Sequence, residues 1–307
     1  MRRVGLSLIA LSALLTASEF QYGSGTFNLN GGFTQGVSGS ISDDIDTYSL
    51  VERHSNVAGS KFFYGYDAMW MDSKTLKQAQ QDNNNLVGQT NNLMPSSSPF
   101  TIPSMDYRVK GLDANIRVGY DVLHENEDNF LGLALLVGIS IPWVDSTSSS
   151  DSSSDNNANF SLESKGSSLN LKNLFKDTKT SFMTYKIGSS ISFQKSLNKK
   201  VSLYGIGSIA YQTGYIKNDY IDSEFSVNGT YQELNAGLYF TPFTEKYKLG
   251  FLTLSPRLYA TLGYKYSKWD IDDVTVDVYN NSVKVEPLMM KFGMDSSVGY
   301  FGVGYSF

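Results

Sequence analysis

Two histidines, His54 and His124, are the natural candidates for acid–base catalysis in this chain, which contains no cysteine. A histidine held close to a serine or a carboxylate can act as the general base of a hydrolase. His124 lies beside Glu125 and Glu127 in a polar stretch typical of a turn, and His54 precedes the first clear strand pattern. The chain contains neither a GxSxG nor an HExxH motif, so we predict that it is not an enzyme and has no catalytic residue.

Two short clusters of acidic residues have a spacing that could bind Ca²⁺. They are Asp43, Asp44 and Asp46, and Asp270, Asp272, Asp273 and Asp277. Neither cluster has the glycine and the terminal glutamate of a complete EF-hand loop. We therefore expect solvated acidic segments, with no bound metal and no cofactor.

Nine further polar residues lie in segments that otherwise alternate between apolar and small side chains. These residues are Lys61, Asp67, Asp113, Asn115, Arg117, Lys186, Glu233, Arg257 and Lys265. They carry both signs of charge, so opposite charges could pair. In a narrow barrel these charges would pair with one another and seal the lumen. In a wider barrel they would line a narrow aqueous path for small solutes.

The segment 112–122 shows most clearly which elements position these residues, because its side chains alternate with a period of two. Apolar side chains occupy every even position from Leu112 to Val122, and Asp113 and Arg117 lie on the opposite face. This alternation predicts strands rather than helices. Similar segments are 58–70, 130–143, 183–193, 226–240 and 252–266, and 201–212 is a further predicted strand of uncertain facing.

Residues 1–18 have the pattern of a secretory signal peptide. Arg2 and Arg3 precede an apolar stretch from Val4 to Leu15, and small residues follow it. That stretch is too short to cross a bilayer, and no later segment reaches the roughly 18 apolar residues of a transmembrane helix. We therefore predict export, followed by folding of residues 19–307 as a single domain.

A closed barrel explains why an exported chain without an apolar helix has so many strands with one apolar face, because these faces can contact lipid. Only helices and closed barrels satisfy every backbone N–H and C=O group inside a bilayer. The polar faces contain Gly, Ser and isolated charges, which suit a narrow lumen. We predict an all-β, closed, antiparallel, up-and-down transmembrane β-barrel; a soluble periplasmic or extracellular β domain is the alternative.

The last predicted strand carries a family signature. Phe301, Val303, Tyr305 and Phe307 share one of its faces and alternate with small residues. An alternating aromatic strand with a terminal Phe resembles the C-terminal signature of bacterial outer-membrane barrels. The architecture resembles the small OmpA-type and opacity-protein-like barrels. This resemblance implies that the barrel-assembly machinery reads these four residues as an assembly signal.

Short and long connections alternate along the chain, as an up-and-down barrel requires. Stretches 124–129, 196–200 and 241–248 are short, 72–106 and 145–178 are long, and 215–223 and 270–282 are intermediate. The pattern predicts short periplasmic turns and long extracellular loops. Counting from residue 58 gives eight strands, the number we favour. Ten strands follow if residues 19–56 form an extra hairpin rather than a segment that precedes the barrel.

Aromatic residues near the strand ends predict two girdles at the membrane interfaces. One girdle consists of Trp70, Trp143 and Trp269, which lie where strands enter the longer connections. The other includes Phe193, Phe240 and Phe307, at the opposite strand ends. These residues would place the barrel between two lipid interfaces.

The predicted fold and composition together indicate a non-enzymatic outer-membrane protein that presents surface loops. The formal net charge is -5, so we expect no nucleic-acid partner. The expected partners are outer-membrane lipid, lipopolysaccharide and, during biogenesis, the assembly machinery. In the favoured narrow barrel the eight charged residues of this set form an internal ion-pair network. A narrow porin for small solutes is the alternative.

Overall fold

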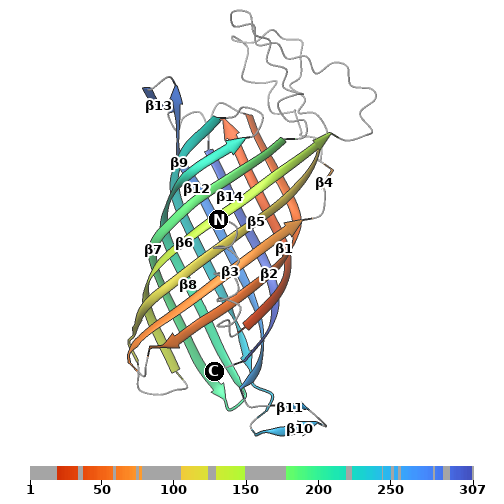
Figure 1. The fold of residues 1–307 in the computed structure, drawn as a ribbon, viewed down its shortest axis with the longest axis vertical. Helices are drawn as coiled ribbons and strands as arrows, with labels where there is room; N and C mark the ends of the chain where they lie inside the picture. The colour runs from red at the N-terminus through yellow and green to blue at the C-terminus, as the bar shows by residue number, and fades with distance from the viewer. Residues whose placement is uncertain are drawn as a thin grey trace, which may run out of the picture.

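Ten long antiparallel strands form one closed sheet in the computed structural model (Figure 1). They are β1 (Glu19–Phe33), β2 (Val37–Asn56), β3 (Phe62–Ser73), β5 (Met105–Asp121), β6 (Asn129–Ser148), β7 (Thr178–Asn198), β8 (Val201–Asn218), β9 (Ser223–Phe240), β12 (Leu258–Val278) and β14 (Lys291–Tyr305). Four short strands complete the set: β4 (Leu76–Lys77), β10 (Tyr247–Leu249), β11 (Leu252–Leu254) and β13 (Asn281–Val285).

The structure describes most of the chain with several gaps. The described ranges are 19–33, 37–57, 60–73, 76–77, 105–123, 129–148, 178–218, 223–243, 245–249, 252–254, 257–278, 281–285 and 291–305. The predicted signal peptide, His124 and Phe307 lie outside them. Within these ranges, no helix has the length and apolar character needed to cross a membrane.

The pairing of the strands closes the sheet. β1 pairs with β2 and β14, and β12 pairs with β14 and β9, so none of the ten long strands is left as an edge. This confirms the predicted closed, antiparallel, up-and-down barrel with an even strand count. The count is ten, the alternative left open by the sequence, rather than the favoured eight. The difference is the hairpin β1–β2, which residues 19–56 form.

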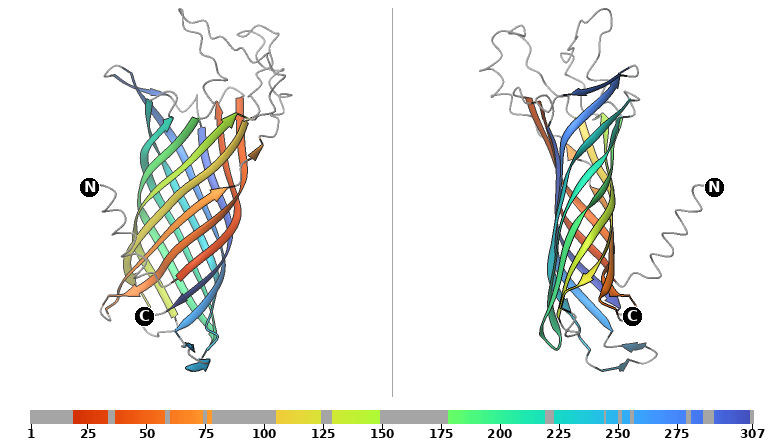
Figure 2. Two further views of the ribbon diagram at one scale, coloured as in Figure 1. Left: turned by 45° about the vertical axis from the view of Figure 1, so that its right-hand side comes forward. Right: turned by 90° about the vertical axis from the view of Figure 1, so that its left-hand side faces the viewer.

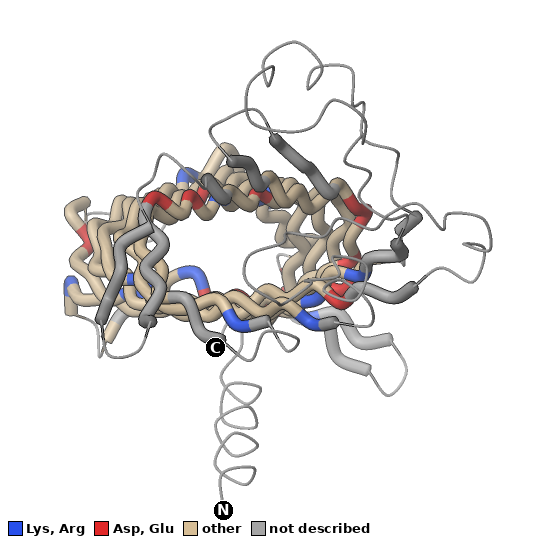
Figure 3. The backbone as a smooth tube through the Cα atoms, turned by 90° about the horizontal axis from the view of Figure 1, so that it is seen from above, with Lys and Arg blue, Asp and Glu red and all other residues tan. Residues whose placement is uncertain are grey.

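The barrel has two distinct ends. At one end, which we call the turn end, residues 199–200 join β7 to β8. β1 begins and β14 ends at this same end. At the other, the long-connection end, β5 and β7 begin after the long stretches that follow β4 and β6. The barrel is broad in Figure 1, narrower in the perpendicular view of Figure 2, and flattened when seen along its axis in Figure 3.

Alternation places one face of each strand outside and the other inside. In β3 most of the side chains alternate between a more exposed and a buried position. The outward face is apolar in the middle of the barrel, where Leu135, Ile187 and Leu262 are 70%, 64% and 63% exposed. A soluble protein rarely exposes a contiguous apolar surface of this extent. This surface is therefore suited to lipid acyl chains.

Replacing Leu135 by arginine tests that assignment. Leu135 points outward and lies near the middle of the apolar outward positions of β6, which run from Leu131 to Ile141. We expect the free energy of unfolding in phospholipid vesicles, measured by urea titration, to fall by about 2–4 kcal/mol because a charge would enter the hydrocarbon. Leu197→Arg, at the exposed turn end of β7, is the depth control and should cost about 0–1 kcal/mol. Equal losses at both positions would contradict a lipid-facing surface.

Candidate functional site

The lumen contains most of the polar residues singled out in the sequence. Asp67, Asp113, Asn115, Arg117, Lys186, Glu233 and Lys265 are all buried inside the barrel, between 0% and 6% exposed. Lys61 and Arg257 were predicted to face the lumen, and this prediction was wrong. Both residues precede the first residue of a strand, β3 and β12, and both are exposed. Strand alternation therefore does not direct them inward, and the Lys61 ammonium lies over the outward-facing Tyr120 ring.

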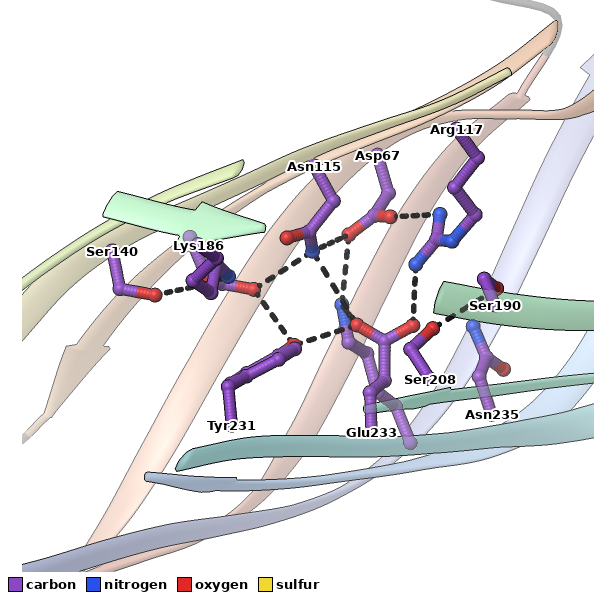
Figure 4. A network of polar contacts seen from close by, with 12 residues as sticks. Asp67, Asn115, Arg117, Ser140, Lys186, Ser190, Ser208, Tyr231, Glu233 and Asn235 are labelled. Atoms are coloured by element: carbon purple, nitrogen blue, oxygen red, sulfur yellow. Dashed lines mark hydrogen bonds and ion pairs between the residues drawn. The ribbon is translucent and has the colours of Figure 1, made fainter. Parts of the chain in front are cut away.

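Six charged side chains form what we call the central ion layer: Asp67, Asp113, Arg117, Lys186, Glu233 and Lys265 (Figure 4). Arg117 bridges two carboxylates, with its terminal nitrogens 2.5 Å from Asp67 Oδ1 and 2.6 Å from Glu233 Oε1. Lys265 Nζ lies 2.9 Å from Asp67 Oδ2 and 3.4 Å from Glu233 Oε2. Lys186 Nζ lies 2.5 Å from Asp113 Oδ1. The layer therefore contains three carboxylates and three cations.

Neutral side chains connect the charges within this layer. Asn115 Nδ2 donates to Asp67 and to Asp113, at 3.1 Å in each case. The Tyr231 hydroxyl donates to Glu233 at 2.7 Å, and the Ser140 hydroxyl donates to Asp113. Buried charges are tolerated when both their charge and their hydrogen-bonding capacity are satisfied. The layer meets the first requirement by equal numbers of opposite charges.

The three carboxylates come close enough to raise the question of a metal site. Ligand oxygens of Asp67, Asp113 and Glu233 lie within 4.8 Å of one another. Each of these carboxylates already contacts an ammonium or guanidinium group of the layer. Protein cations therefore take the place that a metal ion would otherwise have.

Most of a buried apolar layer lies on the long-connection side of the charges, while Leu136 and Val298 pair in register with Arg117 and Lys265. In β3, Met69 and Met71 follow Asp67 toward that end, and in β7 Phe182 precedes Lys186. Together with residues of every other long strand they form one buried cluster. Its most deeply buried large members are Trp269, Tyr231, Phe27, Ile45, Met69, Met71, Leu136 and Met294. The cluster fills the barrel where it would open toward the long connections.

Trp269 belongs to this apolar layer, so its assignment to the outer aromatic girdle was wrong. It is 0% exposed, its ring centroid lies 5.6 Å from that of Tyr231 and 6.5 Å from that of Phe27, and its Nε1 donates to Ser140 Oγ at 2.9 Å. The physical reason is alternation along β12. Trp269 has the same parity as Lys265, and both therefore point inward.

A third layer fills the turn end and was missed in the sequence. Arg53 forms a buried ion pair with Glu19, and its guanidinium lies 4.1 Å from the centroid of the Tyr204 ring. The Tyr204 and Tyr300 hydroxyls are 2.5 Å apart, and Thr261 Oγ1 donates to Glu19 at 2.5 Å. A bulge in the β2–β3 pairing, between Glu52 and Ser55, accompanies the inward position of Arg53. Alternation alone does not reveal such a bulge.

His54 lies next to this turn-end layer. Its ring stacks on Phe130 at a centroid distance of 4.1 Å, and Phe63 packs against Phe130 edge-on. His54 also lines a small pocket with Arg53, Phe130 and Tyr204. Ser192 and Gln194 also line this pocket, so the lining includes a hydroxyl group beside the aromatic and cationic side chains.

The remaining predicted aromatic residues lie on the outward face. Trp70 is 38% exposed, and its ring lies edge-on to Trp143 at 5.3 Å near the long-connection end. Phe193 and Phe240 are exposed near the turn end. The predicted assembly-signal residues Phe301, Val303 and Tyr305 are exposed on β14, and Phe307 lies outside the described ranges.

Comparison with known proteins places the fold. No protein-family model and no curated protein sequence matches the chain. The outer membrane protease OmpT from Escherichia coli matches in structure, with a TM-score of 0.50 over 95% of this chain and 97% of that one. The fold is that of a bacterial outer-membrane β-barrel.

Sequence identity to these structures is low. It is 7% for OmpT, so that likeness concerns the fold alone. The translocator domain of NalP from Neisseria meningitidis is 12% identical over 100% of this chain and 95% of that one, with a TM-score of 0.34. Ail from Yersinia pestis is 12% identical over 93% and 99%, with a TM-score of 0.24. These two scores are too low to support an argument about this chain.

Proposed function

We propose that the chain is an integral outer-membrane protein with a closed lumen, whose role is carried by the segments at its long-connection end. The observation that supports this most directly is the central ion layer, which lies between the apolar layer and the turn-end layer. A barrel whose lumen is filled by these three layers of side chains is rigid and does not offer a path for solutes. Such a barrel serves as an anchor for the long connections between β4 and β5 and between β6 and β7.

The alternative of a narrow porin is disfavoured by the same layers. A conducting pore needs a water-filled path lined by polar groups. Here the lumen-facing charges neutralise one another at 2.5–3.4 Å, and Trp269, Phe27 and Met71 pack beyond them. An ion moving along the axis would have to break these contacts and cross apolar side chains.

A non-enzymatic role is part of the proposal. The structural likeness to OmpT, a protease, extends to the fold at 7% identity and does not transfer its activity. Among the described residues, His54 is the histidine available for acid–base chemistry, and it stacks on Phe130. This environment supports a packing role for His54.

Conductance across a planar lipid bilayer tests the closed lumen. We expect the purified, folded protein to insert without producing steady single-channel steps, because the central ion layer and the apolar layer block the lumen. Faster migration of the unheated protein in SDS gels serves as the control for folding, and membrane flotation serves as the control for insertion. Reproducible conductance steps from inserted wild-type protein would overturn the closed lumen and favour the porin.

A further inference from the structure

Charge is distributed unevenly around the outside of the barrel near the long-connection end. On β3 and β5–β8, the described outward side chains include four cations and two carboxylates: Arg108, Lys110, Lys179 and Lys217, with Asp72 and Asp145. On β2, β12 and β14 they include five carboxylates and one cation: Asp44, Asp46, Asp270, Asp272 and Asp295, with Lys268. The two sides therefore present opposite signs to their surroundings.

Five residues on the cationic side form what we call the basic interface patch: Trp70, Arg108, Lys110, Trp143 and Lys179. Lys110 pairs in register with Trp143 across β5 and β6. The Lys179 ammonium lies 4.6 Å from the centroid of the Trp143 ring, and Trp70 packs against Trp143 at 5.3 Å. The patch therefore combines cations and tryptophans on neighbouring strands.

One cation of the patch is already engaged. Arg108 Nε and one terminal nitrogen donate to the Asp72 carboxylate at 3.0 and 2.9 Å. Asp145 pairs in register with both Arg108 and Lys179. Asp72 also pairs in register with Lys110, so three cations face two carboxylates and this part of the surface carries a net charge of +1. Of the three cations, Arg108 is the one that donates to both oxygens of a carboxylate, which leaves Lys110 and Lys179 to contact a ligand.

The surface below the patch is apolar on the same strands. Toward the turn end, β5 presents Leu112, Ile116 and Val118 on its outward face, and β6 presents Val137 and Leu135. Cations at the interface with an apolar surface beneath them match an amphiphile that carries anionic groups above acyl chains. A second copy of the barrel would not require this vertical arrangement.

We propose that the basic interface patch binds lipopolysaccharide. The patch contacts the phosphate groups of the lipid A headgroup, and the acyl chains of lipid A lie along β5 and β6. The inference rests on the proposed membrane location and adds a specific lipid site to it. Lys110 and Lys179 contact the phosphate groups, and Trp70 and Trp143 lie at the level of the headgroup. The acidic side of the barrel repels the same phosphates, so lipid A binds one side of the barrel.

Retention of lipid A by the purified barrel tests this site. The barrel is refolded in detergent with bisphosphorylated lipid A or with fully dephosphorylated lipid A of the same acyl composition, and bound lipid is counted by native mass spectrometry. We expect the wild type to prefer the bisphosphorylated form. Changing both Lys110→Gln and Lys179→Gln should weaken its binding by about tenfold or more, because both cations that face the phosphates are removed.

Matched variants separate binding from folding and from net charge. Lys199→Gln with Lys200→Gln removes the same charge from the exposed turn between β7 and β8 and should leave lipid A binding unchanged. Lys110→Arg with Lys179→Arg keeps the charge and should retain the binding. All variants are compared after confirmation that they insert into vesicles as the wild type does.

Two results would overturn the site while leaving the membrane proposal intact. One is equal retention of phosphorylated and dephosphorylated lipid A by an inserted wild-type barrel. The other is unchanged lipid A binding by the Lys110 and Lys179 double variant. If that variant instead loses the ability to associate with a second copy of the barrel, the patch is an interface between barrels and not a lipid A site. A wild-type chain that fails to insert into vesicles at all would overturn the proposed function itself.

Discussion

Replacing Arg117 by leucine is expected to lower the free energy of unfolding by about 3–5 kcal/mol, because two buried carboxylates would lose their shared cation. Arg117 is 2% exposed and contacts Asp67 and Glu233 at 2.5 and 2.6 Å. In its absence Lys265 is left as the cation in contact with both. Urea titration of the barrel in phospholipid vesicles, followed by tryptophan fluorescence, measures the loss.

Two controls separate the effect of charge balance from the loss of one side chain. Arg108→Leu breaks the half-exposed pair with Asp72 and should cost at most about 1 kcal/mol. Adding Glu233→Gln to Arg117→Leu restores equal numbers of cations and carboxylates, so this double variant should be more stable than Arg117→Leu alone. A loss below about 1 kcal/mol for Arg117→Leu would contradict a charge-balanced central ion layer.

Replacing Trp269 by alanine is expected to have a comparable effect on stability, with a loss of about 3–5 kcal/mol. Trp269 is fully buried between Tyr231 and Phe27, and it also donates a hydrogen bond to Ser140. The substitution would remove the largest side chain of the apolar layer and leave a cavity inside the barrel. The same urea titration measures the change.

The Trp269 variants also test whether the apolar layer closes the lumen. Trp269→Phe keeps most of the aromatic volume and should lose only about 1 kcal/mol, chiefly from the hydrogen bond. In planar bilayers we expect Trp269→Ala to show more frequent brief openings than the wild type, and Trp269→Phe to behave as the wild type. If the free energy of unfolding of Trp269→Ala equals that of the wild type, the packing role that the structure indicates for Trp269 is contradicted.

Strand alternation carried most of the information about the fold. In 112–122 it correctly separates the lipid-facing residues from Asp113 and Arg117, because a period of two leaves a single choice of face. The hairpin β1–β2 was harder to recognise. The outward positions of β2 near the long-connection end are the polar residues Ser42, Asp44 and Asp46, and Asp43 and Thr47 are buried on the inward face. Polar residues on both faces hide the alternation. Eight strands were therefore favoured over ten.

The contents of the lumen were predictable only in part. Parity indicates that Lys186, Glu233 and Lys265 point inward, but their partners depend on how strands on opposite walls meet, and a sequence does not state that. Parity also directs Trp269 inward, although its place at the end of a strand suggested a girdle residue. The Glu19–Arg53 pair gave no signal, since Glu19 directly follows the predicted signal peptide and Arg53 lies in a bulge.

The central ion layer also bears on the order of events during folding. Among the described residues, Arg117 with Glu233, Lys186 with Asp113, and Lys265 with Asp67 each join strands that are not neighbours in the sheet. No isolated hairpin can form these contacts: the Lys186–Asp113 pair needs the three strands β5, β6 and β7, and the other two pairs need strands on separate parts of the barrel wall. The latter two pairs therefore arise late in folding. Interactions that form after the transition state slow unfolding more than they accelerate folding. The layer therefore favours a long lifetime of the folded barrel.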